Sequence, residues 1–337
     1  MNAAELSKTG QEKLKACFLE DQHLMKVVGL RTVSDLNRVI LAGHVTQVIN
    51  VTEALQERKI ASVADSIKAG GQRLVLLAGP SSSGKTTTSK RLAVQLAAIG
   101  LRPLTLSMDD YFVDRERTPR DEKGDYDFEC LQALDVPLFN QQLLALLNGD
   151  EVQLPTYDFK TGKSLRSGKT MQMGPKDILI VEGIHALNPD LTPDIERDLK
   201  FQLYVSALTT IQLDENRYIS TTDNRLIRRI VRDNNFRNYS AQDTIRRWPS
   251  VRAGEEKWIF PFQENCDMMV NSALLYELAV LRNHVLPILE AVPKDSPEYP
   301  EADRLSDLIS FFQPITDRQI PYTSLLREFL GGSSFRY

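Results

Sequence analysis

The residues best suited to chemistry stand together in one loop, which reads Gly-Pro-Ser-Ser-Ser-Gly-Lys-Thr-Thr over positions 79–87. It fits G-x-x-x-x-G-K-[ST], a pattern whose backbone N–H groups surround the phosphates of a nucleotide. We expect Lys85 to reach the β- and γ-phosphates and the Thr86 hydroxyl to bind Mg²⁺. The alternative is a chance turn rich in glycine and serine. The sequence therefore predicts a nucleoside triphosphate site formed by Gly79, Pro80, Ser81, Ser82, Ser83, Gly84, Lys85, Thr86 and Thr87.

Carboxylates end two further apolar stretches. Asp109 and Asp110 follow residues 104–106, and Glu182 ends residues 177–182. If these stretches are parallel strands, their carboxyl ends lie beside the phosphate loop. Asp109 is then a candidate base for a substrate hydroxyl and a candidate Mg²⁺ ligand, and Glu182 is a second ligand. The alternatives are a helix cap or turn for the aspartates and an ordinary strand end for Glu182.

Four arginines recur at helical spacing, at positions i, i+3, i+4 and i+7. They are Arg225, Arg228, Arg229 and Arg232. Their planar side chains suit phosphate oxygens, which two N–H groups can bind at once. We predict a lid that closes over the triphosphate, with Arg228 and Arg229 catalytic, Arg232 on the nucleotide, and Arg237, Arg246 and Arg247 further out. A solvated basic helix face is the alternative.

Strands and helices alternate from residue 74 onward, which predicts an α/β fold of the P-loop NTPase class. The expected strands, 74–78, 104–106, 178–181, 201–205 and 268–270, form a mostly parallel five-stranded sheet with helices on both faces. A polar insertion, 115–174, separates the second strand from the third and carries a predicted helix at 136–147 and a hairpin of 152–154 with 170–173. Such an insertion usually builds a substrate pocket. An amphipathic helix kinked at Pro287 is expected over 272–292.

The domain division follows from these patterns. Residues 1–72 predict a helical N-terminal segment, with helices near 11–28, 34–41 and from 45 to the Gly70-Gly71 stop. Residues 73–292 predict the nucleotide-binding domain, with the arginine lid over 223–260. Residues 293–337 predict a C-terminal tail packed on that domain.

Composition narrows the functional classes. The 337 residues carry a net charge of −4 and a pI near 5.7, which argues against nucleic acid as a partner. The three cysteines are odd in number and far apart, which favours a reducing compartment, so we expect a cytoplasmic protein. The sequence contains no apolar run of membrane-spanning length, and we expect no membrane contact. The absence of an Asn-Lys-x-Asp motif disfavours a GTPase switch.

At this point the residues resemble the uridine kinase/phosphoribulokinase family, over roughly positions 73–281. The likeness rests on the loop, on Ser-Met-Asp-Asp-Tyr-Phe (107–112), on Leu-Pro-Thr-Tyr-Asp-Phe (154–159), on Ile-Val-Glu-Gly-Ile (180–184) and on Arg-Leu-Ile-Arg-Arg-Ile-Val-Arg-Asp (225–233). A bacterial subgroup annotated uridine kinase-like is closer still; its longer members carry threonyl-tRNA-synthetase-like segments upstream. Residues 1–72 resemble the helical end of such a region, and the chain is expected to be a short form.

The resemblance implies a kinase that moves the γ-phosphate of ATP, with Mg²⁺, to a hydroxyl of a small-molecule acceptor, most simply a nucleoside of the uridine or cytidine type. It implies Asp109 as base, Thr86 and Glu182 near the metal, and Tyr157 in the substrate pocket. We expect the further substrate-binding residues to be Asp110, Tyr111, Asp127 and Arg166. Two departures bear on the acceptor. The family's Phe-Asp-His-Pro reads Tyr-Asp-Phe-Glu-Cys over 126–130, and Thr161-Gly162 stands where a base-contacting histidine is usual.

Three alternatives stay open on sequence alone. The acceptor is a nucleoside, or it is another hydroxyl compound such as a sugar phosphate, pantothenate or a nucleotide. The third alternative is a nucleotide-gated regulatory or RNA-associated protein. Relatives often form dimers or tetramers, so a homo-oligomer is also compatible with the sequence.

Overall fold

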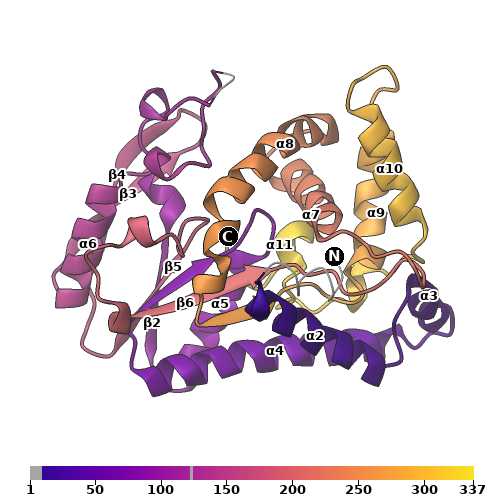
Figure 1. Cartoon of the computed structure of the whole chain (residues 1–337), viewed down its shortest axis with the longest axis horizontal. Coiled ribbons are helices and arrows are strands. Elements are labelled where there is room, and N and C mark those ends of the chain that lie inside the picture. Colours follow the sequence, from indigo (N-terminus) through magenta and orange to yellow (C-terminus); the bar gives the residue numbers. More distant parts are fainter. Residues whose placement is uncertain (1–9, 122–123) are drawn as a thin grey trace.

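The structure is a computed structural model that describes residues 10–121 and 124–337. At its centre lies a five-stranded parallel sheet in the order β2-β5-β1-β6-β7 (Figure 1). The strands are β1 (Leu74–Ala78), β2 (Arg102–Ser107), β5 (Asp177–Glu182), β6 (Lys200–Ser206) and β7 (Met268–Asn271). The predicted fold class is confirmed.

The strand order decides which strand ends meet. β5 lies between β1 and β2, with Leu77 opposite Glu182 on one side and Ser107 opposite Glu182 on the other. Glu182 therefore stands between the loop that follows β1 and the aspartates that follow β2. In doubly wound sheets of this kind, ligands bind beyond the carboxyl ends of the strands.

One face of the sheet is covered by α4 (Val45–Gly70) and α5 (Lys85–Ala98). In Figure 1, α4 runs beneath the whole sheet. The side chains of α4 that face the sheet are apolar and buried, and they meet alternate residues of the central strands: Ile60, Val63, Ala64 and Ile67 against Val75, Leu77, Ile178 and Ile180. The helix ends at Gly71, whose φ of +71° is the left-handed conformation that favours glycine. The helical N-terminal segment, with α2 (Glu12–Val27) and α3 (Val33–Leu41), is confirmed.

The opposite face of the sheet meets the insertion. It contains α6 (Val136–Asn148) and an antiparallel hairpin of β3 (Val152–Asp158) and β4 (Lys163–Met171). Apolar α6 residues pack against this face of the sheet, with Phe139, Leu143 and Leu146 fully buried. The return strand begins well before the predicted 170–173, because the turn after Asp158 closes within five residues.

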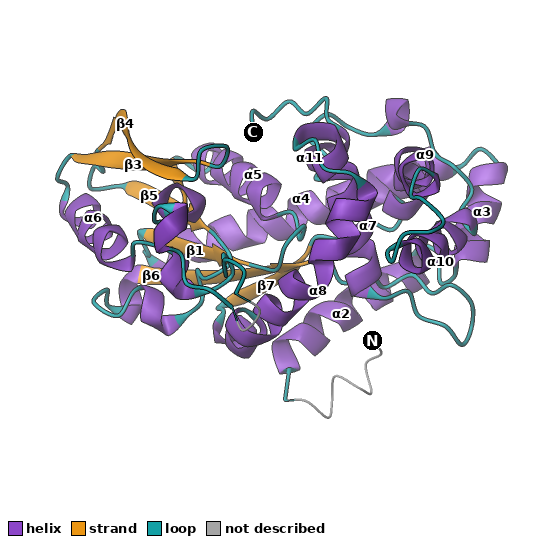
Figure 2. Cartoon of the chain, turned by 90° about the horizontal axis from the view of Figure 1, so that it is seen from above, coloured by secondary structure: helices purple, strands orange, loops and turns teal. Residues whose placement is uncertain are grey.

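The other half of the molecule is helical (Figure 2). It contains α7 (Thr221–Phe236), α8 (Ala241–Trp258), α9 (Glu277–Glu290), α10 (Tyr299–Ser310) and the short α11 (Arg327–Leu330). α9 begins later than the predicted 272, because Ser272 is held by the carbonyls of Ser206 and Ser83 instead of by a helical turn. The tail joins the same apolar core through Leu325, Leu326 and Phe329.

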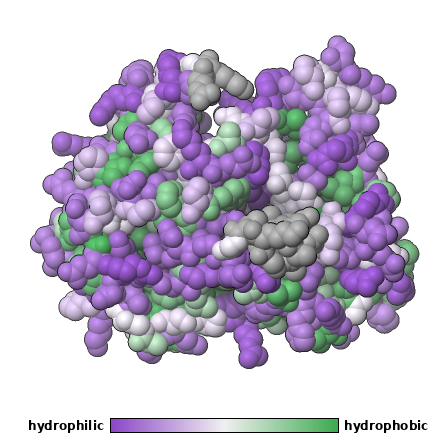
Figure 3. Space-filling model, in the orientation of Figure 1, coloured by the Kyte–Doolittle hydropathy of each residue, from purple (hydrophilic) through white to green (hydrophobic). Residues whose placement is uncertain are grey.

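The next feature is the hydropathy of the surface. The face drawn in Figure 3 is predominantly hydrophilic, with small and scattered apolar patches. Among the described residues, no helix combines the length and the apolarity that crossing a membrane requires.

Candidate active site

The phosphate loop joins β1 to α5 in the conformation that its motif predicts. Gly79 leaves no room for a side chain, since a Cβ atom there would lie 2.1 Å from the carbonyl oxygen of Val205 on β6. Gly84 has a φ of +83° and caps α5, and Ser82 adopts a φ of +58°, a strained value for a residue other than glycine. The Lys85 ammonium donates to the carbonyls of Gly79 (2.9 Å) and Pro80 (3.2 Å).

The loop carbonyls are bound from behind. The guanidinium of Arg225 donates to the Ser81 carbonyl at 3.0 Å, and Arg228 donates to the Ser82 carbonyl at 3.3 Å. The hydroxyl of Ser272 donates to the Ser83 carbonyl. These contacts hold the carbonyls on the outer side of the loop, and backbone N–H groups on the concave side of such a loop bind an anion. The loop is therefore organised for phosphate before any nucleotide arrives.

This bracing corrects the predicted lid. Arg225 and Arg228 are 1% and 0% exposed and pair with the buried carboxylates of Glu255 and Glu277. The opposite side of α7 is buried as well, in Leu226, Ile227, Ile230 and Val231. Most of α7 therefore packs into the core, while Arg229 and Arg232 are less deeply buried. Arg228 therefore braces the loop from outside the reacting groups, and the prediction that it is catalytic does not fit this placement.

Two arginines of α7 remain beside the loop. Arg229 donates from Nη1 to the Ser81 hydroxyl at 2.8 Å, and its Nε lies 3.3 Å from a carboxylate oxygen of Asp233. Arg232 donates twice to Asp233, at 2.7 and 3.0 Å. Asp233 is 2% exposed and holds both side chains in place. Burial lowers the pKa of Arg229, as does the nearby charge of Arg232. The two guanidiniums place positive charge beside the loop.

Two carboxylates at the strand ends, Asp109 and Glu182, lie beside the side chains of Lys85 and Thr86. The Thr86 hydroxyl donates to Glu182 at 3.1 Å, and Asp109 and Lys85 shift one another's pKa through their charges. Desolvation raises the pKa of Glu182 to about 7. Asp109 is open to solvent on one side, but the surrounding protein desolvates it and raises its pKa, against the opposing effect of Lys85. A carboxylate with a raised pKa is a stronger base.

The insertion, which was predicted to form the acceptor pocket, contacts the turn after β2. Asp110 accepts a hydrogen bond from the Thr156 hydroxyl at 3.2 Å, which ties the turn after β2 to the hairpin strand β3. The adjacent Tyr157 is 6% exposed, and its hydroxyl has no partner among the described residues. Its ring contacts Phe112 and Phe159, and Phe159 is itself exposed. Asp110 and Tyr157 are thus brought to the same side of the sheet as Asp109.

The other predicted substrate residues lie differently. Tyr111 is 1% exposed, packs edge-on against Phe139 and donates its hydroxyl to Gln142 at 2.7 Å, so it belongs to the core and not to the substrate site. Asp127 accepts the N–H of Glu129 and shapes the turn before it. Arg166 is exposed on β4, opposite Pro155.

Two carboxylates of the site escaped the sequence analysis. Glu129 faces Arg229, Lys85, Asp109 and Glu255, and desolvation raises its pKa to about 7. Glu255 is fully buried and accepts the Ser81 N–H at 3.1 Å. A side chain at Gly254 would collide with Glu129, since a Cβ there would lie 2.5 Å from its Cβ. The only hint in the sequence was the glutamate that replaces the family's usual residues at 129.

The donor set fits a magnesium ion bound together with a nucleotide. No cluster of three His, Cys, Asp or Glu side chains able to hold a metal occurs in the described part of the chain. Mg²⁺ is typically held by one or two carboxylates, with substrate phosphates and water as its remaining ligands. The hydroxyl of Thr86 and the carboxylate of Glu182, 3.1 Å apart at the strand ends, are oxygen ligands of this kind.

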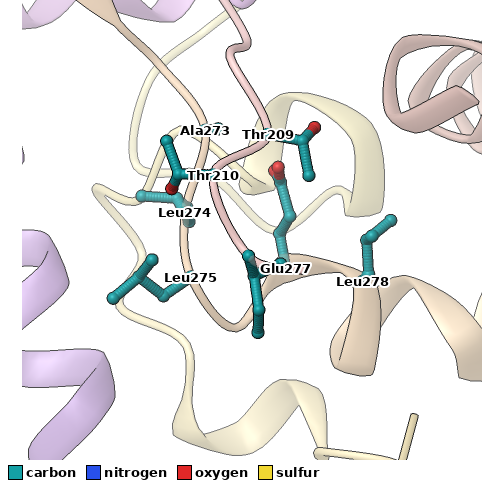
Figure 4. Close-up of a pocket in the computed structure, with 8 residues that line it drawn as sticks. Thr209, Thr210, Ala273, Leu274, Leu275, Glu277 and Leu278 are labelled. Atoms are coloured by element: carbon teal, nitrogen blue, oxygen red, sulfur yellow. The ribbon is translucent and has the colours of Figure 1, made fainter. Parts of the chain in front are cut away.

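A separate small pocket lies behind the loop. Its volume is about 10 Å³, room for roughly one water molecule. The carboxylate of Glu277 and the side chains of Thr209 and Thr210 stand among leucines around it (Figure 4). Glu277 is already paired with Arg228 and Asn224. This pocket is too small for a nucleotide and belongs to the bracing of the loop.

Comparison with known proteins agrees with this geometry. Residues 74–277 match the Phosphoribulokinase / Uridine kinase family, which is more than half of the chain. The chain belongs to this family of kinases. A uridine kinase of Staphylococcus aureus (strain JH9) is 30% identical over 199 residues, which are 58% of this chain and 86% of the relative. The protein is therefore an ATP-binding phosphotransferase that acts on a hydroxyl acceptor.

Solved structures of kinases are also similar to this family member. A protein of Bacillus stearothermophilus described as a possible uridine kinase is 22% identical and has a TM-score of 0.42. The match covers 64% of this chain and 98% of that one. D-glycerate 3-kinase of Cryptococcus neoformans is 18% identical with a TM-score of 0.33, and the match covers 81% of this chain and 87% of that one.

Proposed function

We propose that this kinase transfers the γ-phosphate of ATP to a hydroxyl group of a nucleoside of the uridine or cytidine type. The observation that carries the proposal is the meeting of Asp109, Glu182 and Lys85 at the carboxyl ends of β2, β5 and β1. A phosphate cradle, a metal ligand and a base are the parts that phosphoryl transfer needs.

The donor half of the proposed site is the loop with its neighbours. The loop N–H groups and Lys85 bind the phosphates, and Arg229 and Arg232 neutralise charge on the transferring group. Thr86 and Glu182, with Asp109 nearby, hold Mg²⁺. When bound, the metal would supply positive charge that stabilises the negative charge developing on the transferring phosphate.

The acceptor half is proposed to lie between Asp109 and the hairpin. Asp109 accepts the proton of the acceptor hydroxyl as that oxygen attacks the γ-phosphorus, and its raised pKa favours this step. Asp110 keeps β3 beside the base through Thr156. Tyr157 presents a buried hydroxyl that has no hydrogen-bond partner in the described part of the chain. Asp127 and Arg166 are proposed to act through the turns that border this pocket.

One observation favours a second class of acceptor. Gly162 has a φ of +73°, and a Cβ atom there would lie 2.7 Å from the Arg115 guanidinium. A side chain at this position would be strained by the positive φ and would push Arg115 aside. The position lies where a base-contacting histidine is usual in uridine kinases. An acceptor recognised by its hydroxyl or anionic groups, such as a sugar phosphate or pantothenate, is therefore the alternative substrate. For either acceptor, we propose a cytoplasmic enzyme acting on small molecules.

A screen of ATP consumption over nucleosides, sugars, sugar phosphates and pantothenate tests the proposal. We expect ADP formation above the acceptor-free rate with uridine or cytidine. We also expect a product whose mass exceeds that of the nucleoside by one phosphoryl group. If only sugar phosphates or pantothenate stimulate ADP formation, that compound and not the nucleoside is the acceptor. A flat response to every acceptor, with intact ATP binding, would favour a regulatory protein instead.

A further inference from the structure

The C-terminal segment reaches back onto the phosphate loop. Figure 2 shows the C-terminus lying over α5, beside α11. Glu328, on α11, accepts hydrogen bonds on one carboxylate oxygen from the Thr87 N–H (3.1 Å) and the Thr87 hydroxyl (2.6 Å). The Tyr337 hydroxyl lies 2.8 Å from the same Thr87 hydroxyl. Glu328 and Tyr337, which follow Thr87 by 241 and 250 positions in the chain, thus both contact this one residue of the loop.

The position that Glu328 occupies is one a nucleotide needs. Thr87 lies in the first turn of α5, where unpaired N–H groups and the helix dipole bind anions, and these are the groups that cradle the phosphates in this motif. The Thr87 N–H can serve a carboxylate or a phosphate, and two anions at one donor repel each other. The negative charge of Glu328 also acts on Lys85 and Glu182.

The C-terminal segment is held by buried apolar side chains in its first part and by polar contacts in its last part. Leu325, Leu326 and Phe329 are buried in the helical core, and a Cβ atom on Gly84 would lie 2.8 Å from Leu325. Beyond α11, Ser333 and Ser334 donate to the Tyr322 carbonyl. The exposed Tyr337 contacts Thr87, and its ring centroid lies 5.6 Å from the Lys90 ammonium. Buried apolar side chains therefore anchor the segment as far as Phe329, whereas residues 331–337 are held by polar contacts near the surface.

We propose that Glu328 is an internal competitor for the nucleotide: its carboxylate closes the phosphate site, and nucleotide binding turns the Glu328 side chain away from Thr87 and releases residues 331–337. This inference rests on the nucleotide site of the proposed function. It adds an autoinhibitory contact that lowers the apparent affinity by the fraction of molecules in the closed state.

Nucleotide affinity tests the competition directly. The dissociation constant of a non-hydrolysable ATP analogue with Mg²⁺ is measured by titration calorimetry, without acceptor, for the wild type and Glu328→Gln. The amide keeps the size of the side chain and removes its charge, so we expect binding about fivefold tighter or more. Glu290→Gln makes the same change at an exposed position of α9 and should leave the affinity unchanged. Equal or weaker binding by a folded Glu328→Gln protein would overturn the proposal.

A second measurement needs no variant. Hydrogen exchange of the wild-type backbone over residues 328–337 is compared with and without the saturating analogue. Displacement predicts faster exchange in the bound state, whereas unchanged or slower exchange contradicts it. Because neither measurement includes an acceptor, a wrong acceptor assignment leaves both outcomes intact. Loss of all nucleotide binding in the wild type would instead count against the kinase site itself.

Discussion

Asp109 is the residue on which the chemistry depends. It lies at the end of β2, its pKa is raised by desolvation, and Lys85 faces it across Glu182. We predict that Asp109→Asn lowers the transfer rate by about 10²-fold or more, since the amide does not accept the proton. ATP binding should be retained, because the loop is untouched. Rate and binding are measured on the same preparation, and undiminished transfer would show that another group is the base.

Glu129 gives the site a pH dependence. Desolvation raises its pKa from 4.5 to about 7, so the folded protein holds a proton that the unfolded chain releases. Its contribution to stability is fully present below pH 4.5 and is lost as pH rises to about 7. We predict that the unfolding temperature of the wild type falls over this range more steeply than that of Glu129→Gln. Parallel curves for the two proteins would contradict the assignment.

The residue scale also shows what sequence reasoning can reach. The loop, Asp109 and Glu182 were predictable because each follows an apolar strand and parallel strand ends converge. Glu129, Glu255 and Glu328 were not, because each reaches the loop from a turn or helix far away in the chain. Nothing local marks such a carboxylate in the sequence.

At the scale of elements, α7 is the main correction. Its arginines have the predicted spacing, but Arg225 and Arg228 point into the core. There they form ion pairs with the buried carboxylates of Glu255 and Glu277. Periodicity gives the face on which residues lie and leaves open whether that face meets solvent or other helices. The sheet itself was predictable, since five apolar runs alternated with helices. The hairpin was predicted too short because its polar, exposed strand β4 has little apolar alternation.

Arg228 provides the test of this correction. Replacing it with methionine removes one partner of a buried ion pair and leaves Glu277 uncompensated, so we predict a loss of about 3–5 kcal/mol in the free energy of unfolding. Arg237→Met, at an exposed position of the same region, should cost at most about 1 kcal/mol. Urea unfolding of both variants measures the difference. Full stability with lost turnover in Arg228→Met would restore the catalytic assignment.

At the scale of the whole molecule, the N-terminal helices belong to the folded unit although the family match begins at residue 74. α4 covers one face of the sheet, and Lys59 on α4 pairs with Asp21 on α2 at 2.5 Å. Asp21 also accepts from Asn271 at the end of β7. We therefore propose that residues 10–72 stabilise the sheet directly and do not form an independent module.

A pair of substitutions on α4 tests this proposal. Ile67 is fully buried against the sheet, and Ile67→Asp places a charge there without a partner. We predict destabilisation of several kcal/mol, on the order of 3–5, or failure to fold. Ser66→Asp introduces the same group at the neighbouring exposed position and should change stability by about 0.5 kcal/mol or less. Similar stability of both variants would mean that α4 is dispensable to the sheet.

The central claim is phosphoryl transfer from ATP to a nucleoside hydroxyl, and mass spectrometry of the product tests it most directly. ATP carrying ¹⁸O in its γ-phosphate is incubated with uridine or cytidine, Mg²⁺ and either the wild type or Lys85→Ala. We predict a nucleoside monophosphate that retains the label, formed in equal amount with ADP by the wild type and absent with Lys85→Ala. Unlabelled nucleoside with the label recovered only in free phosphate, or equal product from both proteins, would contradict the account.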